Sequence, residues 1–174
     1  ETLEGLAKKP VVVITDSQAF EQVAKDTPDD IPLTSFSILM ARSKGDLAEL
    51  AEGARAIDTL KPGDSVLIAE ACTHHRQADD IGTVKIPRWL KKSVGGDLNF
   101  EWFSGMGFPA DIKKYKLIVH CGACMINRRE MLHRISVAKE QGVPIVNYGV
   151  LIAHLHGILP RALKHVDDKT DALD

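Results

Sequence analysis

The sequence predicts an α/β protein with parallel-rich sheets flanked by helices. Short runs of β-branched residues alternate with stretches in which apolar residues recur every three to four positions. This alternation is typical of βαβ units, in which a helix carries the chain from one strand back to a parallel neighbour. With 174 residues, 44% of them hydrophobic, the chain is long enough for one good core, or for one domain and part of another.

The first half of the chain contains two strand candidates and two helix starts. Val11–Ile14 is the first predicted strand, and Ser17 after it is placed to cap a helix. Thr34–Met40 is the second predicted strand. Asp46, with Glu49 three residues later, resembles a capping pair at the start of an amphipathic helix.

The second half begins with a predicted strand over residues 65–71, which runs directly into a cysteine. Residues 76–116 break the rhythm, because glycines and aromatic residues are scattered through them. A connection of this length inside a compact domain is usually functional. Regular order then resumes with strands over 117–119 and 143–147 and helices over 127–141 and 150–159.

Composition and charge exclude several classes of function. A formal charge of −2 and a pI near 6.4 provide no basic surface for nucleic acid. The longest apolar runs are too short to cross a bilayer, so no membrane association is expected. Three cysteines, an odd number, fit a reducing compartment, and we expect a cytoplasmic protein. The chain opens at Glu1 without a methionine, and we expect it to be a piece of a longer protein.

The three cysteines carry the chemistry that the sequence predicts. Cys72-Thr73-His74 lies upstream, and His120-Cys121-Gly122-Ala123-Cys124 lies downstream. A C-x-H unit combined with H-C-x-x-C is hard to explain by packing and favours thiolate ligation of iron or zinc. Each unit follows a predicted strand. If those strands are parallel, both units emerge at the same carboxyl edge of the sheet, where open α/β sheets build their sites.

Other interpretations of the cysteines remain open at this point. A structural zinc site would take the three thiolates and one imidazole, from His74, His75 or His120. His120 is the better candidate for a donor to a sulfur, and the other two histidines for direct contact with the metal. A redox dithiol at Cys121-x-x-Cys124 would leave the upstream unit without a role. Inert buried cysteines rarely gather at strand ends.

Further motifs surround the cysteines over nearly the whole chain: Ile68–His75, Asp79–Gly82, Lys85–Leu90, Gly95–Phe100 and His120–Met125, together with Thr34–Leu39 and Asn147–Gly149. On these motifs the sequence resembles the HydF family of FeFe-hydrogenase maturation factors. The combined cysteine and histidine signature is the specific part of the resemblance.

The resemblance implies a protein of three parts: a GTPase domain, a dimerisation domain and a 4Fe–4S domain. This chain has no G-x-x-x-x-G-K-[ST] loop, so the GTPase activity of a full-length member is not expected in it. By similarity, residues 1–64 would be part of the dimerisation domain and residues 65–174 a Rossmann-like cluster domain. Cys72, Cys121 and Cys124 would hold the 4Fe–4S cluster, with His74 and His120 near its fourth iron.

The same resemblance implies a homodimeric scaffold and carrier, not an enzyme, within this stretch of chain. Such a protein holds a diiron precursor as cargo and delivers it to apo-FeFe-hydrogenase, with two radical-SAM maturases as further partners. Three thiolates leave one iron of a cubane open to an exchangeable ligand, which suits that role. The runner-up is a zinc-stabilised interaction module without cluster chemistry. Four cations form either a site for anionic cargo or a solvated face: Lys85, Arg88, Lys91 and Lys92.

Overall fold

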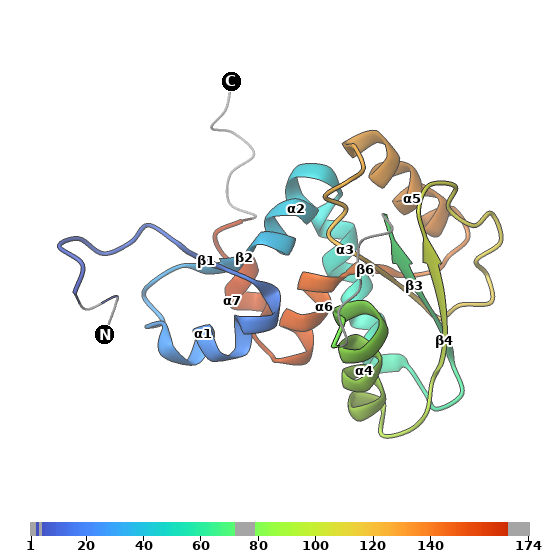
Figure 1. The fold of residues 1–174 in the computed structure, drawn as a ribbon, viewed down its shortest axis with the longest axis horizontal. Helices are drawn as coiled ribbons and strands as arrows, with labels where there is room; N and C mark the ends of the chain where they lie inside the picture. Colours follow the sequence, from blue (N-terminus) through green and yellow to red (C-terminus); the bar gives the residue numbers. More distant parts are fainter. Residues whose placement is uncertain (1–2, 4, 72–78, 167–174) are drawn as a thin grey trace.

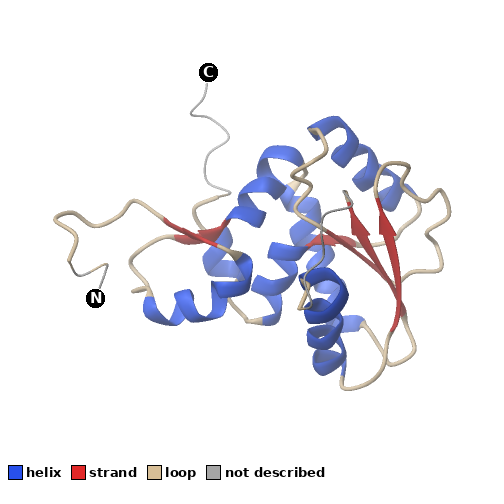
Figure 2. Ribbon diagram, in the orientation of Figure 1, coloured by secondary structure: helices blue, strands red, loops and turns tan. Residues whose placement is uncertain are grey.

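The computed structural model describes residues 3, 5–71 and 79–166. It confirms the α/β class: two parallel sheets are flanked by helices (Figures 1 and 2). The smaller sheet pairs β1 (Val13–Thr15) with β2 (Leu33–Ser35). The larger sheet has the order β4-β3-β5-β6 and is parallel throughout. Its strands are β3 (Ser65–Glu70), β4 (Asn99–Ser104), β5 (Leu117–His120) and β6 (Ile145–Asn147).

The first helix follows the first strand of the smaller sheet. After β1, the 3-10 turn η1 (Ser17–Ala19) continues into α1 (Phe20–Asp26). The side chain that caps η1 is Asp16, which accepts from the Gln18 amide, so the predicted cap at Ser17 is wrong by one residue. Among described residues no helix is long and apolar enough to cross a membrane.

The predicted strand over residues 34–40 is wrong beyond its second residue. The strand β2 ends at Ser35, and the chain turns at once into α2 (Phe36–Lys44). The Ser35 hydroxyl accepts a hydrogen bond from the Ile38 amide, which satisfies one of the free N–H groups at the start of the helix. This local cap overrides the strand preference of the apolar residues around it.

In the sequence, α3 (Leu47–Ala54) lies between the strands of the smaller sheet and those of the larger one, and it leads into the turn η2 (Arg55–Thr59). It begins at the predicted Asp46 cap, whose carboxylate accepts a hydrogen bond from the Glu49 amide. It packs so closely on β6 that a Cβ added at Gly53 would lie 2.0 Å from the Ile145 carbonyl oxygen. Only glycine permits that approach. The last described helices are α6 (Tyr148–Leu155), which follows β6, and α7 (Leu159–Leu163).

Gly53→Ala is expected to destabilise the protein by about 2 kcal/mol or more, because the added methyl group must push α3 away from β6. Gly122→Ala is the matched control, since an added Cβ there meets only the Ser37 hydroxyl at 3.7 Å. Urea unfolding of both variants measures the difference. Equal stability of the two variants would show that α3 can move away from β6 with little loss in the free energy of unfolding.

The long segment after residue 78, expected as an irregular connection, contains regular structure. A π-helical turn η3 (Ile81–Lys85) leads into α4 (Ile86–Val94), which ends at the left-handed Gly95, and β4 follows. The segment is therefore mostly a βαβ crossover from β3 to β4. A second helical crossover runs from β5 through α5 (Arg128–Glu140) to β6, and the predicted cap of α5, Asn127, is confirmed.

The two helical crossovers leave the centre of the sheet in opposite directions. β3 leads to β4 at one edge, and β5 leads to β6 at the other. Right-handed crossovers in opposite directions place their helices on opposite faces. The contacts agree: Trp102 and Glu70 approach Gly82 of η3, whereas Phe103 and His120 contact Arg134 of α5. The switch point between β3 and β5 is where open α/β sheets bind their ligands.

Candidate metal centre

The predicted site residues fall at this switch point. Cys121 is the first residue after β5, is partly buried, and begins a loop that reaches the exposed Cys124 before α5 starts. Cys72, His74 and His75 lie in residues 72–78, outside the described residues. The prediction that strands β3 and β5 are parallel is confirmed, so both cysteine units follow strands that end at one carboxyl edge.

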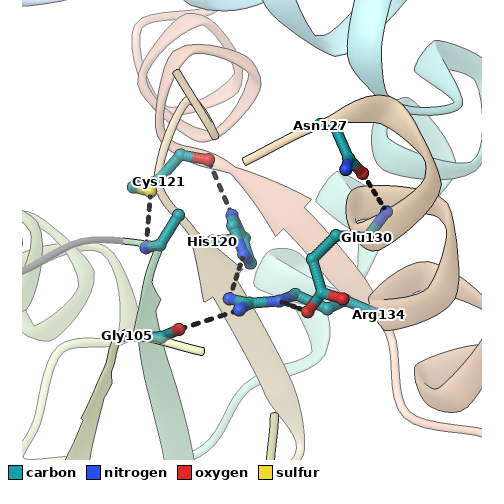
Figure 3. Close-up of polar contacts among 7 residues, drawn as sticks. Gly105, His120, Cys121, Asn127, Glu130 and Arg134 are labelled. Carbon is teal, nitrogen blue, oxygen red and sulfur yellow. Dashed lines mark hydrogen bonds and ion pairs between the residues drawn. The ribbon is translucent and has the colours of Figure 1, made fainter. Parts of the chain in front are cut away.

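The residue after β3 and the residue after β5 are in direct contact. The Ala71 amide donates a hydrogen bond to Cys121 Sγ over 3.2 Å (Figure 3). Ala71 is the residue before Cys72 in the sequence. A backbone N–H aimed at a cysteine sulfur favours the thiolate and is the kind of hydrogen bond that tunes iron–sulfur centres. The arrangement of this edge therefore suits a thiolate ligand.

His120 is completely buried behind Cys121, and both of its ring nitrogens are engaged. Nε2 lies 3.1 Å from Arg134 Nη1, and Nδ1 lies 2.8 Å from the Cys121 carbonyl oxygen (Figure 3). A guanidinium only donates, so Nε2 is the acceptor and Nδ1 carries the proton that is donated to the carbonyl. The ring thus fixes the backbone of Cys121 and has no nitrogen left for a metal.

Burial lowers the pKa of His120 to about 4, and the positive charge of Arg134 acts in the same direction. On acidification the unfolded chain takes up this proton near pH 6.5, before the folded protein does. The free energy of unfolding therefore falls as the pH drops from about 6.5 towards 4, by about 2 kcal/mol at pH 4.5 relative to pH 7.

His120→Gln should remove that part of the pH dependence, because the glutamine carbonyl can accept from Arg134 and does not titrate. Urea unfolding of metal-free wild type and variant at pH 7 and pH 4.5 measures the two losses of stability. The wild type is expected to lose more than the variant. Equal losses would mean that His120 is protonated as readily in the folded protein as in the unfolded chain.

Arg134 is a site residue that the sequence analysis missed. Its side chain is fully buried, with Nε 3.0 Å from Glu130 Oε1 and Nη2 donating to the Gly105 carbonyl over 2.8 Å. The guanidinium also lies over the rings of Phe103 and Phe108, 5.8 and 5.5 Å from their centroids. One signal was available, since position 134 falls on the apolar stripe of the predicted helix.

A second polar group lies on the other face of the sheet. Glu70, the last residue of β3, is buried and accepts from the Tyr148 hydroxyl over 3.3 Å and from the Ser104 hydroxyl over 3.2 Å. Burial and the nearby carboxylate raise the pKa of Tyr148 well above its ordinary value. Gly82 of η3 packs against both groups, because a Cβ there would lie 2.3 Å from the tyrosine oxygen. Glu70 and Ala71, the two residues before Cys72, are thus both held by hydrogen bonds to other elements.

The four predicted cargo-binding cations do not lie together. Lys85 precedes α4 near the carboxyl edge and contacts Asp79 at 3.2 Å and Gln18 at 2.6 Å. Lys91 is in the last turn of α4, and its Nζ lies 2.8 Å from Oδ1 of Asp97, a residue just before β4 begins. Arg88 is exposed between these ends, and Lys92 lies beside Lys91. The helix therefore directs part of the set away from the cysteines.

Within residues 5–71 and 79–166, no group of three or more His, Cys, Asp or Glu side chains converges on one point. The predicted set needs Cys72, which lies outside those ranges. Its ligation by three cysteines stays a prediction.

Two family models match the chain. Residues 1–45 match the hydrogen maturase F dimerization domain, and residues 48–165 match the hydrogen maturase F tetramerization domain. No curated protein matches the chain. The two models divide the chain between residues 45 and 48, and the proposed division at residues 64 and 65 stays a prediction. Both descriptions establish self-association as a property of these segments.

Proposed function

The chain belongs to the hydrogen maturase F family, and on that premise we propose that it is an iron–sulfur scaffold and carrier in FeFe-hydrogenase maturation. In this proposal Cys72, Cys121 and Cys124 hold a 4Fe–4S cluster, and the chain is the cytoplasmic, self-associating part of a larger GTPase. The cluster would supply an iron atom to which incoming cargo can bind.

The observation that carries the proposal is the Ala71 N–H donated to Cys121 Sγ at the switch point of the sheet. This contact joins the strand end before Cys72 to the strand end at Cys121. Soft thiolates of this kind select iron–sulfur clusters or zinc. The 13-residue helix α5 begins four residues after Cys124, and its positive end favours thiolates and an anionic cluster.

The contacts around the cysteines support a fixed, orienting role for His120 and an exchangeable ligand on the fourth iron. His120 is bound to Arg134 and to the Cys121 carbonyl, so we assign it to orientation of the cysteine backbone. The fourth iron would then take His74, His75, a carboxylate or solvent. Neutral imidazole and oxygen ligands hold iron less firmly than thiolate does, and a strong-field ligand on the cargo can displace them.

Cargo with cyanide ligands would be anionic. Lys85 directly precedes α4, and Arg88 lies in the first turn of that helix, whereas Lys91 and Lys92 lie in its last turn. We propose that Lys85 and Arg88, more than Lys91 and Lys92, face such cargo. By family the recipient is apo-FeFe-hydrogenase, and the two radical-SAM maturases supply the cargo. The chain's own part in delivery is to hold the cluster with one open corner at an accessible edge.

Ligand exchange at that corner tests the function. In a fully loaded sample, added cyanide or imidazole should shift the EPR spectrum of the reduced cluster without loss of iron. His74→Ala should alter that response and leave the cluster intact. If neither added ligand changes the spectrum, the fourth position is closed and the cluster serves structure or electron transfer.

A further inference from the structure

The cysteine loop, residues 121–126, is held by a cation from a different part of the chain. Lys44, the last residue of α2, extends its ammonium into the loop and donates to three carbonyl oxygens. The distances are 3.2 Å to Ala123, 2.8 Å to Cys124 and 2.9 Å to Ile126. No carboxylate among the described residues pairs with this ammonium, and its hydrogen bonds go to the loop backbone.

A second cation crosses the same junction in the opposite direction. Arg128, the first residue of α5, donates to the carbonyls of Ser43 and Gly45 over 3.1 Å each. These are carbonyls that the end of α2 leaves without helical partners. The segment matching the dimerization model and the segment matching the tetramerization model therefore join at the cysteine loop.

The backbone of the loop explains what the lysine achieves. Within a planar trans peptide the C=O of one residue and the N–H of the next point in opposite directions. Carbonyls gathered on Lys44 therefore turn the amides of Cys124, Met125 and Asn127 away from it. Ala123 adopts the left-handed conformation, with φ of 59°, which is unfavourable for alanine and persists only when its surroundings impose it.

We propose that Lys44 is a positioning residue of the cluster site. Its ammonium fixes the cysteine loop in the conformation that presents thiolates and amide N–H groups to the metal. The N-terminal segment thereby forms a structural part of the centre. The inference rests on the proposed function where it concerns the cluster, but the effect of Lys44 on the loop does not require a cluster.

The metal-free protein provides the first test. Alkylation by iodoacetamide at one fixed pH, with each cysteine followed by peptide mass mapping, measures opening of the loop. Lys44→Met should raise the rate at the partly buried Cys121 about threefold or more, because the loop opens more often. Lys44→Arg, which keeps the charge and the donors, should restore most of the protection. The exposed Arg129→Met, on α5, is the matched loss of positive charge and should leave the rate unchanged.

The loaded protein provides the second test. Loss of Lys44 removes a positive charge and loosens amides that can donate to sulfur, and both changes favour the oxidised cluster. The midpoint potential of Lys44→Met should therefore be more negative than that of wild type, with Lys44→Arg close to wild type. An unchanged Cys121 rate in Lys44→Met overturns the inference, whether or not a cluster forms. Failure of wild type to assemble a cluster overturns the proposed function and leaves the alkylation result to decide on Lys44.

Discussion

Arg134→Met is expected to lower the free energy of unfolding by about 3 kcal/mol or more, the largest stability effect of any single substitution considered for this chain. The guanidinium is fully buried and donates to Glu130, His120 and the Gly105 carbonyl. Methionine fills a similar volume between the two phenylalanine rings but donates nothing. Its three former acceptors would lose their donor. The Glu130 side chain is 24% exposed and can turn to water, but the His120 ring is fully buried and cannot.

Urea unfolding of the metal-free variant at pH 7 measures this loss. Arg129→Met is the matched control, because it removes the same charge from an exposed position on the same helix and should change stability by less than about 0.5 kcal/mol. If the two variants were equally stable, the buried network would contribute no more than a surface charge. The loop after β4 should also become more open in Arg134→Met, since Gly105 loses its tie to α5.

Cys121→Ala and Cys124→Ala are each expected to reduce iron in the reconstituted protein from about four atoms per chain to almost none, because two thiolates cannot retain a cubane. The chain has no fourth cysteine to substitute for the lost ligand. Met125→Ala is the control, since this side chain is 71% exposed directly beside Cys124. A cysteine variant with full iron content and the wild-type spectrum would remove that residue from the ligand set.

The sequence was sufficient to predict the α/β class because most strands and helix caps depend on short-range signals. The Asp46 and Asn127 caps were recognised from one side chain and its partner three residues on, and both form as expected. The strand over 34–40 was wrong because Ser35 also caps a helix, and the apolar residues after it fit either element. Strand β4 was missed because four of its six residues are exposed, two are only partly buried, and the two kinds do not alternate regularly.

The site was predictable only to the level of its thiols. Spacing and strand order locate Cys121 and Cys124 at the carboxyl edge, where the structure has them. Of the residues that hold them, His120 is adjacent to Cys121, but Ala71 is 50 positions from Cys121 and Lys44 is 80 positions from Cys124. Such pairings depend on how α2 packs against the cysteine loop and on which strands are neighbours in the sheet, and no local pattern specifies either. An arginine on the apolar stripe of α5 was the one visible hint.

Metal content after anaerobic reconstitution tests the central claim most directly. The chain should be loaded with iron and sulfide while zinc is present as a competitor, and both metals and acid-labile sulfide should then be counted. The proposed scaffold predicts a brown protein with about four irons and four sulfides per chain and little zinc. A colourless protein with about one zinc and no sulfide would contradict it and would identify these cysteines as a structural zinc site.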